Sequence, residues 1–167
     1  MVVRPARYQD LAHLPAIERS AARTFRGSSE DAIADDGVSP VEFYIPFQTD
    51  GLVLVAEVEG VLSGFAACQA CADALHLWEL AVRHDAQGQG LGKALIGATM
   101  DLARARGLPA VTLSTFREIP WNGPFYARMG FREVPVEALG ERLSVIRLRE
   151  ELLGLPVDRR LFMRAPI

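Results

Sequence analysis

The sequence predicts an α/β domain built on a mixed β-sheet, and two observations carry this prediction. Apolar stretches at 52–57, 61–70 and 75–82 are separated by short turns, which favours an antiparallel meander. A long amphipathic stretch at 91–106 then leads to a further apolar stretch at 111–114. A strand–helix–strand crossover of this length implies that the strands it joins are parallel. The sheet should therefore contain both kinds of pairing.

Composition limits the class of protein. Half of the 167 residues are apolar and 23% are charged, so we expect one globular domain over residues 1–167. The net charge of −3 argues against a nucleic acid or an anionic membrane as partner. No apolar run approaches the roughly 20 residues of a membrane span, and the N-terminus lacks the apolar core of a signal peptide. The expected location is the cytoplasm.

The N-terminal part predicts a strand and a helix. Residues 2–4 form a short opening strand, and Asp10 is of a type that often caps a helix N-terminus. The helix itself is predicted by apolar residues at helical spacing, namely Leu14, Ile17, Ala21 and Phe25.

The segment 28–50 is acidic and contains no Lys or Arg. We expect loops and one or two short helices here, because Gly and Pro interrupt it. One interpretation is a solvated acidic surface. The other is an acidic and aromatic wall that attracts a cationic substrate. The residues of this wall would be Glu30, Asp31, Asp35, Asp36, Glu42, Phe43, Tyr44, Phe47 and Asp50.

The C-terminal part predicts a short helix, then a strand at 131–136, a helix at 139–153 and a last strand at 160–164. Asn122 is expected to cap the short helix. The cysteines Cys68 and Cys71 have C-x-x-C spacing, but they lie on a predicted strand, where residues three apart face opposite sides. With no second ligand pair for zinc, we expect two unpaired thiols and no metal site.

The strand 75–82, the glycine-rich turn 87–92 and the helix behind it predict a seat for a phosphate-bearing cofactor. Glycines let a backbone approach a ligand, and a helix N-terminus adds partial positive charge. The dinucleotide pattern G-x-G-x-x-G is not met, because the chain has G-x-G-x-G. The nucleotide triphosphate pattern fails as well, because Ala94 follows Lys93.

The turn resembles the Q/R-x-x-G-x-G/A motif of the GNAT superfamily of N-acetyltransferases, through Gln87, Gly90 and Gly92. The order of elements resembles that superfamily over nearly the whole chain, including the short helix whose sequence ends Phe125-Tyr126-x-x-x-Gly130-Phe131. The resemblance implies a mostly antiparallel sheet of about six to seven strands, splayed at the cofactor site and flanked by helices. It also implies acetyl-CoA as co-substrate, with no metal.

The resemblance implies where coenzyme A would bind. Its pyrophosphate would sit on the backbone N–H groups of Gln87, Gly88, Gln89, Gly90, Leu91, Gly92 and Lys93. Its pantetheine arm would run beside the backbone of Leu80, Ala81 and Val82. Phe125 and Asn122 are further candidates. Asn122, however, lies closer to the Tyr than the family's Asn usually does, so its capping role alone could explain it.

Two residues are candidates for the chemistry. Glu79 is a charge in an otherwise apolar strand, and burial would raise its pKa toward neutrality, as a general base requires. Tyr126 matches the position of the family's general acid, and a phenol can give a proton to a departing thiolate. The competing interpretations are a structural ion for Glu79 and a core aromatic for Tyr126. His76 should face away from Glu79, because their spacing along the strand is odd.

These observations predict an N-acetyltransferase that moves an acetyl group from acetyl-CoA to a primary amine by direct attack in a ternary complex. The expected acceptor is a small cationic amine. The alternatives are a catalytically silent coenzyme A-binding regulatory domain, a protein or peptide N-acetyltransferase, and a nucleotide- or dinucleotide-binding enzyme. The sequence does not set the oligomeric state, a homodimer being one option.

Overall fold

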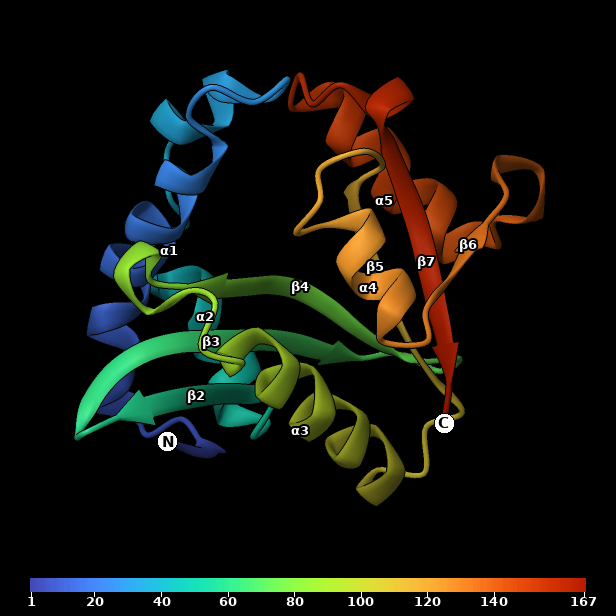
Figure 1. The fold of residues 1–167 in the computed structure, drawn as a ribbon. Helices are drawn as coiled ribbons and strands as arrows, with labels where there is room; N and C mark the ends of the chain where they lie inside the picture. Colours follow the sequence, from blue (N-terminus) through green and yellow to red (C-terminus); the bar gives the residue numbers. More distant parts are fainter.

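The computed structural model describes all 167 residues and contains a seven-stranded sheet in the order β1-β2-β3-β4-β5-β7-β6 (Figure 1). Only the β4–β5 pair is parallel, which confirms the predicted mixed, mostly antiparallel sheet. The strands are β1 (Val2–Pro5), β2 (Val53–Val58), β3 (Val61–Ala70), β4 (Leu75–Val82), β5 (Ala110–Phe116), β6 (Arg132–Val134) and β7 (Arg160–Pro166).

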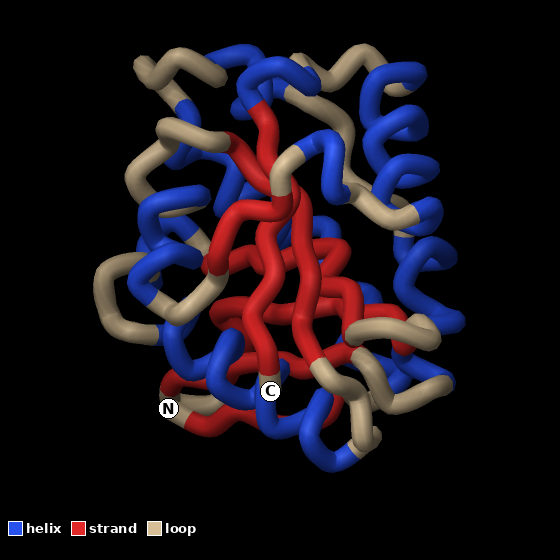
Figure 2. The backbone as a smooth tube through the Cα atoms, turned by 90° about the vertical axis from the view of Figure 1, so that its right-hand side faces the viewer, coloured by secondary structure: helices blue, strands red, loops and turns tan.

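Helices cover both faces of the sheet (Figure 2). α3 and α4 pack on one face, whereas α1, α2 and α5 pack on the other. None of the helices combines the length and the apolar character needed to cross a bilayer. The α-helices are α1 (Leu14–Ala22), α2 (Val41–Thr49), α3 (Leu91–Ala105), α4 (Gly123–Arg128) and α5 (Glu141–Leu152). Short 3₁₀ turns occupy Tyr8–His13, Arg23–Phe25, Asp31–Asp35, His84–Ala86, Val136–Ala138 and Val157–Arg159.

The sheet splays open between its two central strands. β4 and β5 pair only from Leu75 to Leu77, opposite Val111 to Leu113. Beyond this point β5 stays paired with β7, while β4 stays paired with β3. The two halves of the sheet therefore diverge toward the C-terminal ends of β4 and β5, as Figure 1 shows. The predicted splay is confirmed, and it creates an opening in the middle of the fold.

A bulge in β4 changes which side chains share a face. The register with β3 shifts between Ala67 and Cys68, so that Trp78 is an extra residue in β4. Beyond a bulge the alternation of side chains is inverted. His76 consequently lies on the face covered by α5, and Glu79 lies on that same face beneath α1. The expectation that His76 faces away from Glu79 is wrong, because it assumed an unbroken strand.

Two predicted helix caps are also wrong. Asp10 lies inside a 3₁₀ turn, where its carboxylate accepts the N–H of Arg7 at 2.7 Å and the guanidinium of Arg4 at 2.6 Å. Asn122 precedes α4, but its side chain makes no capping hydrogen bond. The thiols of Cys68 and Cys71 are free, as predicted, and burial raises the pKa of Cys68 to about 12.

Candidate active site

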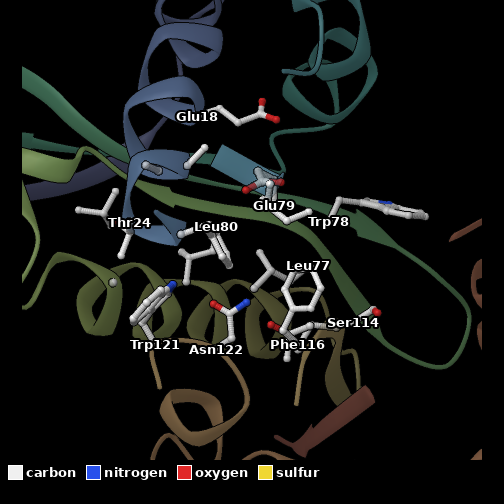
Figure 3. A pocket seen from close by; sticks show the side chains of 18 of the residues that line it. Glu18, Thr24, Leu77, Trp78, Glu79, Leu80, Ser114, Phe116, Trp121 and Asn122 are labelled. Carbon is white, nitrogen blue, oxygen red and sulfur yellow. The ribbon is translucent and has the colours of Figure 1, made fainter. Parts of the chain in front are cut away.

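A cleft of about 790 Å³ occupies the splay between β4 and β5 (Figure 3). One wall comes from α1, β4 and the turn that begins α3. The opposite wall comes from β5, α4, α5 and the start of β7. Because the cleft lies where the sheet pairing ends, it can be reached by side chains from both faces of the sheet. Residues on opposite faces can therefore act on one bound molecule.

The side chain of Gln87 fixes the glycine-rich turn to the rest of the fold. Its Nε2 donates to the carbonyl oxygen of Val82 at 3.0 Å, and its Oε1 accepts from the Thr24 hydroxyl at 2.8 Å. The first residue of the motif thus joins the end of β4 to the segment after α1. This contact sets the orientation of the turn and leaves the turn's backbone free for a ligand.

The turn presents backbone N–H groups to the cleft. Gly88 and Gly90 have φ angles of +75° and +84°, a left-handed conformation that glycine adopts without strain. A Cβ at either position would meet no atom within 4 Å, so the space above the turn is open. The N–H of Ala94 donates to the carbonyl oxygen of Gly90 at 3.0 Å. The N–H groups that precede Ala94 at the start of α3 therefore have no partner within the helix. This arrangement fits a pyrophosphate.

Most of the predicted coenzyme residues line the cleft, but Gln89 and Ala81 do not. The register with β3 explains the second exception. The N–H of Arg83 bonds the carbonyl of Ser63 at 2.8 Å, so every second residue of β4 turns its backbone groups to β3, including Ala81. Leu80 and Val82 turn theirs to the open side. The Val82 carbonyl oxygen accepts from Gln87, and the Leu80 N–H bonds Glu79. The groups still available to a pantetheine arm are therefore the Val82 N–H and the Leu80 carbonyl oxygen.

Glu79 lines the cleft, and Figure 3 shows its carboxyl group on the side of Glu18. Its pKa is raised to about 8, first by burial and then by the negative charge of Glu18, while the charge of Arg160 opposes the shift. Burial also raises the pKa of Glu18. The Glu18 carboxylate is held by the Tyr44 hydroxyl at 2.7 Å and the Ser39 N–H at 3.1 Å. Glu79 is therefore a group that can take up a proton near neutral pH.

The phenol of Tyr126 approaches the cleft from the opposite face of the sheet. α4 positions it, and Gly123 lets this helix lie against β5, since a Cβ there would be 2.5 Å from the carbonyl oxygen of Arg117. The ring packs against Phe125 and Phe131. Burial, and then the charge of Glu79, raise the pKa of Tyr126 above its ordinary value. The hydroxyl thus stays protonated and can act as a donor.

The family profile described as "Acetyltransferase (GNAT) domain" matches residues 49–133, which is just over half of the chain. The chain belongs to the GNAT acetyltransferase family. This confirms the predicted family, whose profile describes an acetyltransferase domain. No three His, Cys, Asp or Glu side chains of this GNAT chain lie close enough together to hold a metal ion.

Similar proteins support the assignment of the fold. The GNAT chain is 30% identical to mycothiol acetyltransferase of Clavibacter michiganensis over 118 residues, which are 69% of the chain and 35% of that protein. It therefore spans about a third of the length of this curated relative. PaiA N-acetyltransferase of Thermoplasma acidophilum, solved with coenzyme A, is 16% identical with a TM-score of 0.73, covering 99% of this chain and 98% of that one. Ribosomal-protein-alanine N-acetyltransferase of Brucella melitensis is 22% identical with a TM-score of 0.71, covering 100% of both chains.

Asn122 and Phe125 both line the cleft of this GNAT domain, from the start of α4. Figure 3 shows the Asn122 side chain directed into the cleft, where it is free of the capping bond expected of it. The ring of Phe125 lies beside Gly92, whose added Cβ would be 3.5 Å from it. A contact of either residue with coenzyme A stays a prediction.

Sequence reasoning missed several residues of the GNAT cleft. Glu18 is the most informative, since it lies on α1 at helical spacing from Leu14 and so breaks an apolar stripe. A charged residue on the apolar face of a helix could have indicated a functional position. Arg160 had no such signal, because its partners come from other elements. Its Nη2 bonds Glu150 at 2.9 Å and Ser114 at 3.1 Å, and its guanidinium lies 4.8 Å from the ring centre of Phe116.

Most residues of the acidic segment 28–50 do not form the acidic and aromatic wall that the sequence suggested. Asp31 and Asp35 pair with Arg26, and Glu30 pairs with Arg159. Of the acidic residues in 28–50, only Asp36 lines the cleft. The aromatic residues mostly pack inward, with Tyr44 fully buried. Besides Asp36, the acidic residues that line the cleft are Glu18, Glu79 and Glu150, all from outside the segment 28–50.

Proposed function

We propose that the chain is a single catalytic domain over residues 1–167 and an N-acetyltransferase acting on a small cationic primary amine. The acetyl group would pass from acetyl-CoA directly to the amine, with both substrates bound at once. The observation that carries this proposal is the convergence of Glu79 and Tyr126 on one cleft from opposite faces of the sheet. The anion-binding turn lies at the coenzyme end of that cleft.

The protons of the reaction define what the protein must do. An ammonium group and a thioester become an amide, a thiol and one free proton, as a C–N bond forms and a C–S bond breaks. One proton must therefore leave the amine for solvent, and one must reach the sulfur. Acetyl-CoA supplies the activated acyl group, and the side chains supply the proton transfers.

Glu79 supports the first transfer. Its pKa of about 8 makes the carboxylate a far stronger base than an ordinary Glu, so it can accept a proton from an ammonium ion held beside it. The backbone N–H of Leu80 and the charge of Arg160 moderate the shift and keep a fraction of the carboxylate ionised at neutral pH. Glu79 would act as the general base.

Tyr126 supports the second transfer. Tyr126 lines the cleft, and its raised pKa keeps the proton on the phenol oxygen until a strongly basic thiolate forms. Tyr126 would act as the general acid. The charge of Glu79 contributes to this raised pKa, so the two groups are close enough to influence each other.

The charge of the cleft supports a cationic acceptor. Glu18 and Glu79 form no ion pair, whereas the other buried carboxylate of the cleft, Glu150, is paired with Arg160. An ammonium ion bound beside these two carboxyl groups would favour their ionised forms, so a cationic acceptor and the two groups would stabilise each other. The names of the similar proteins differ in their acceptors, so the acceptor class rests on the cleft itself.

A screen of primary amines with acetyl-CoA, followed by release of free thiol, tests the proposal. We expect turnover with small cationic amines and at least a hundredfold loss in Glu79→Gln, with coenzyme affinity unchanged. A chain that binds coenzyme A but releases no thiol with any amine would instead be a silent binding domain. Stabilisation by ATP or NAD(P), without stabilisation by acetyl-CoA, would indicate a nucleotide-binding enzyme.

A further inference from the structure

One segment crosses the mouth of the cleft and touches the opposite wall. We call residues 23–36, which follow α1, the bridging segment. It contributes Phe25, Ile33 and Asp36 to the cleft lining. In Figure 1 its turn, in light blue, meets the red loop before β7 above the splay of the sheet. Two contacts, described next, join the segment to the far side.

The first contact is an ion pair between residues 129 positions apart. The guanidinium of Arg159 donates to Glu30 through Nε at 2.7 Å and through Nη2 at 3.0 Å, a two-point geometry. The side chain of Glu30 is only 4% exposed, whereas that of Arg159 is 58% exposed. A buried carboxylate that loses its only cation must return to water, so the position of the segment depends on Arg159.

The second contact is aromatic. The ring of Phe25 lies edge-on to those of Phe116 and Trp121, at 5.8 Å between ring centres in both pairs. Phe116 belongs to β5, and Trp121 belongs to the loop before α4. Aromatic pairs at this separation are attractive. The bridging segment is thus attached to the opposite wall at two separate points.

Both ends of the ion pair are braced. Within the segment, Arg26 donates to Asp35 at 2.7 Å and the N–H of Gly27 donates to Asp31 at 2.6 Å. On the other side, the carbonyl oxygen of Arg159 accepts the N–H of Arg117 at 2.8 Å. These bonds reduce the conformational entropy that each partner loses when the pair forms. The Glu30–Arg159 ion pair is therefore supported on both sides by further hydrogen bonds, unlike an isolated surface ion pair.

We propose that the Glu30–Arg159 pair determines acceptor size, by closing the acceptor end of the cleft to polypeptides while admitting a small amine. The proposal rests on the proposed function and names its substrate class more narrowly. An extended peptide needs an open groove that its chain can leave on both sides of the reacting amine. Here Ile33 on the bridging segment and Leu155 in the loop before β7 both line the cleft, and the ion pair joins residues within four positions of each.

A size series of acceptors tests the proposal. The wild type and three variants would be compared on a short alkyl diamine and on a lysine-containing hexapeptide. The variants are Arg159→Ala, Glu30→Gln and the charge swap E30R/R159E. The matched control is Arg132→Ala, an exposed arginine on β6 that does not line the cleft. We expect the wild type and the control to use the diamine far better than the hexapeptide.

We expect the three variants to change the acceptor preference according to the charge that each leaves unpaired. Arg159→Ala strands a buried carboxylate, so the ratio of kcat/KM for hexapeptide over diamine should rise at least about tenfold. Glu30→Gln keeps an acceptor for Arg159 and should raise the ratio less. The charge swap should return the ratio toward the wild-type value. A ratio that stays unchanged in Arg159→Ala, or a wild type that prefers the hexapeptide, would overturn the proposal.

Amide hydrogen exchange separates this proposal from the proposed function. If the wild type acetylated no amine, the proposed function would fail, and the bridge could still be judged without acceptor. Exchange in residues 26–36 should then be at least about tenfold faster in Arg159→Ala than in the wild type or Arg132→Ala. Equal exchange in all three proteins would show that the ion pair does not hold the segment.

Discussion

Glu18 and Glu79 share one wall of the cleft, and neither carboxylate has a cation bound to it (Figure 3). α1 places the first and β4 places the second, just beyond the bulge at Trp78. The Tyr44 hydroxyl and the Ser39 N–H hold Glu18 in position, so its charge acts on Glu79 from a fixed point. This arrangement makes the pH dependence of the enzyme predictable.

The rate of acetyl transfer should rise with pH through the titration of Glu79. The base form is the carboxylate, and the pKa of about 8 means that this form is the minor one at neutral pH. We expect kcat/KM to increase as pH passes from about 7 to about 9 and then to level off. Glu79→Gln should lose at least a hundredfold in kcat together with this limb of the profile. If Glu79→Gln kept the same rise of kcat/KM with pH, the rise would instead report the titration of the acceptor amine.

Replacing Glu18 by Gln should move the same limb to lower pH. The substitution removes the like charge that raises the pKa of Glu79, and a Gln oxygen can still accept from Tyr44. The pH profile of kcat/KM with one acceptor measures the shift. Glu42→Gln is the control, because Glu42 is exposed on α2 and lies outside the cleft. Coincident profiles for Glu18→Gln and the wild type would contradict the coupling.

Local patterns in the sequence were sufficient to predict the turn and its strand and helix. The glycines at 88, 90 and 92, the apolar β4 and the stripe of α3 each depend on neighbours within a few residues. The family, the mixed sheet and the places of Glu79 and Tyr126 at the cleft followed from these patterns. The roles of the two side chains in catalysis stay predictions.

Other features depend on contacts that no local pattern contains. The bulge at Trp78 is set by the register with β3, and it alone brings His76 and Glu79 to one face. The Glu30–Arg159 pair joins residues 129 positions apart. Asn122 is a residue type that often caps helices, but its side chain makes no capping hydrogen bond. Its backbone conformation is set where α4 comes close to β5 at Gly123, a contact between distant elements.

Tyr126→Phe should slow turnover without unfolding the protein. Phenylalanine keeps the ring packing against Phe125 and Phe131 but removes the hydroxyl proton that the leaving thiolate needs. We expect kcat to fall by about ten- to a hundredfold and Tm to change little. Tyr8→Phe is the matched control, since Tyr8 is 66% exposed and lies outside the cleft. Thiol release at saturating substrate is the measurement, and an unaltered kcat would remove Tyr126 from the mechanism.

The backbone of the glycine turn should be sensitive to a single methyl group. At Gly90 the φ of +84° strains any L-residue, and an added Cβ would project into the open space above the turn. We expect Gly90→Ala to lower the free energy of unfolding by about 1 kcal/mol and to weaken binding of coenzyme A by about tenfold or more.

Gly97→Ala separates these two effects. Gly97 lies in the interior of α3 with no atom within 4 Å of an added Cβ and with no positive φ. Alanine should therefore stabilise the helix there by about 0.5–1 kcal/mol and leave coenzyme binding unchanged. Denaturant unfolding and calorimetric titration with coenzyme A measure both quantities. A methyl group at Gly90 would occupy the space where the phosphate oxygens would meet the N–H groups at the start of α3. If Gly90→Ala lost stability but bound coenzyme A as tightly as Gly97→Ala, the pyrophosphate would therefore have to bind away from the turn.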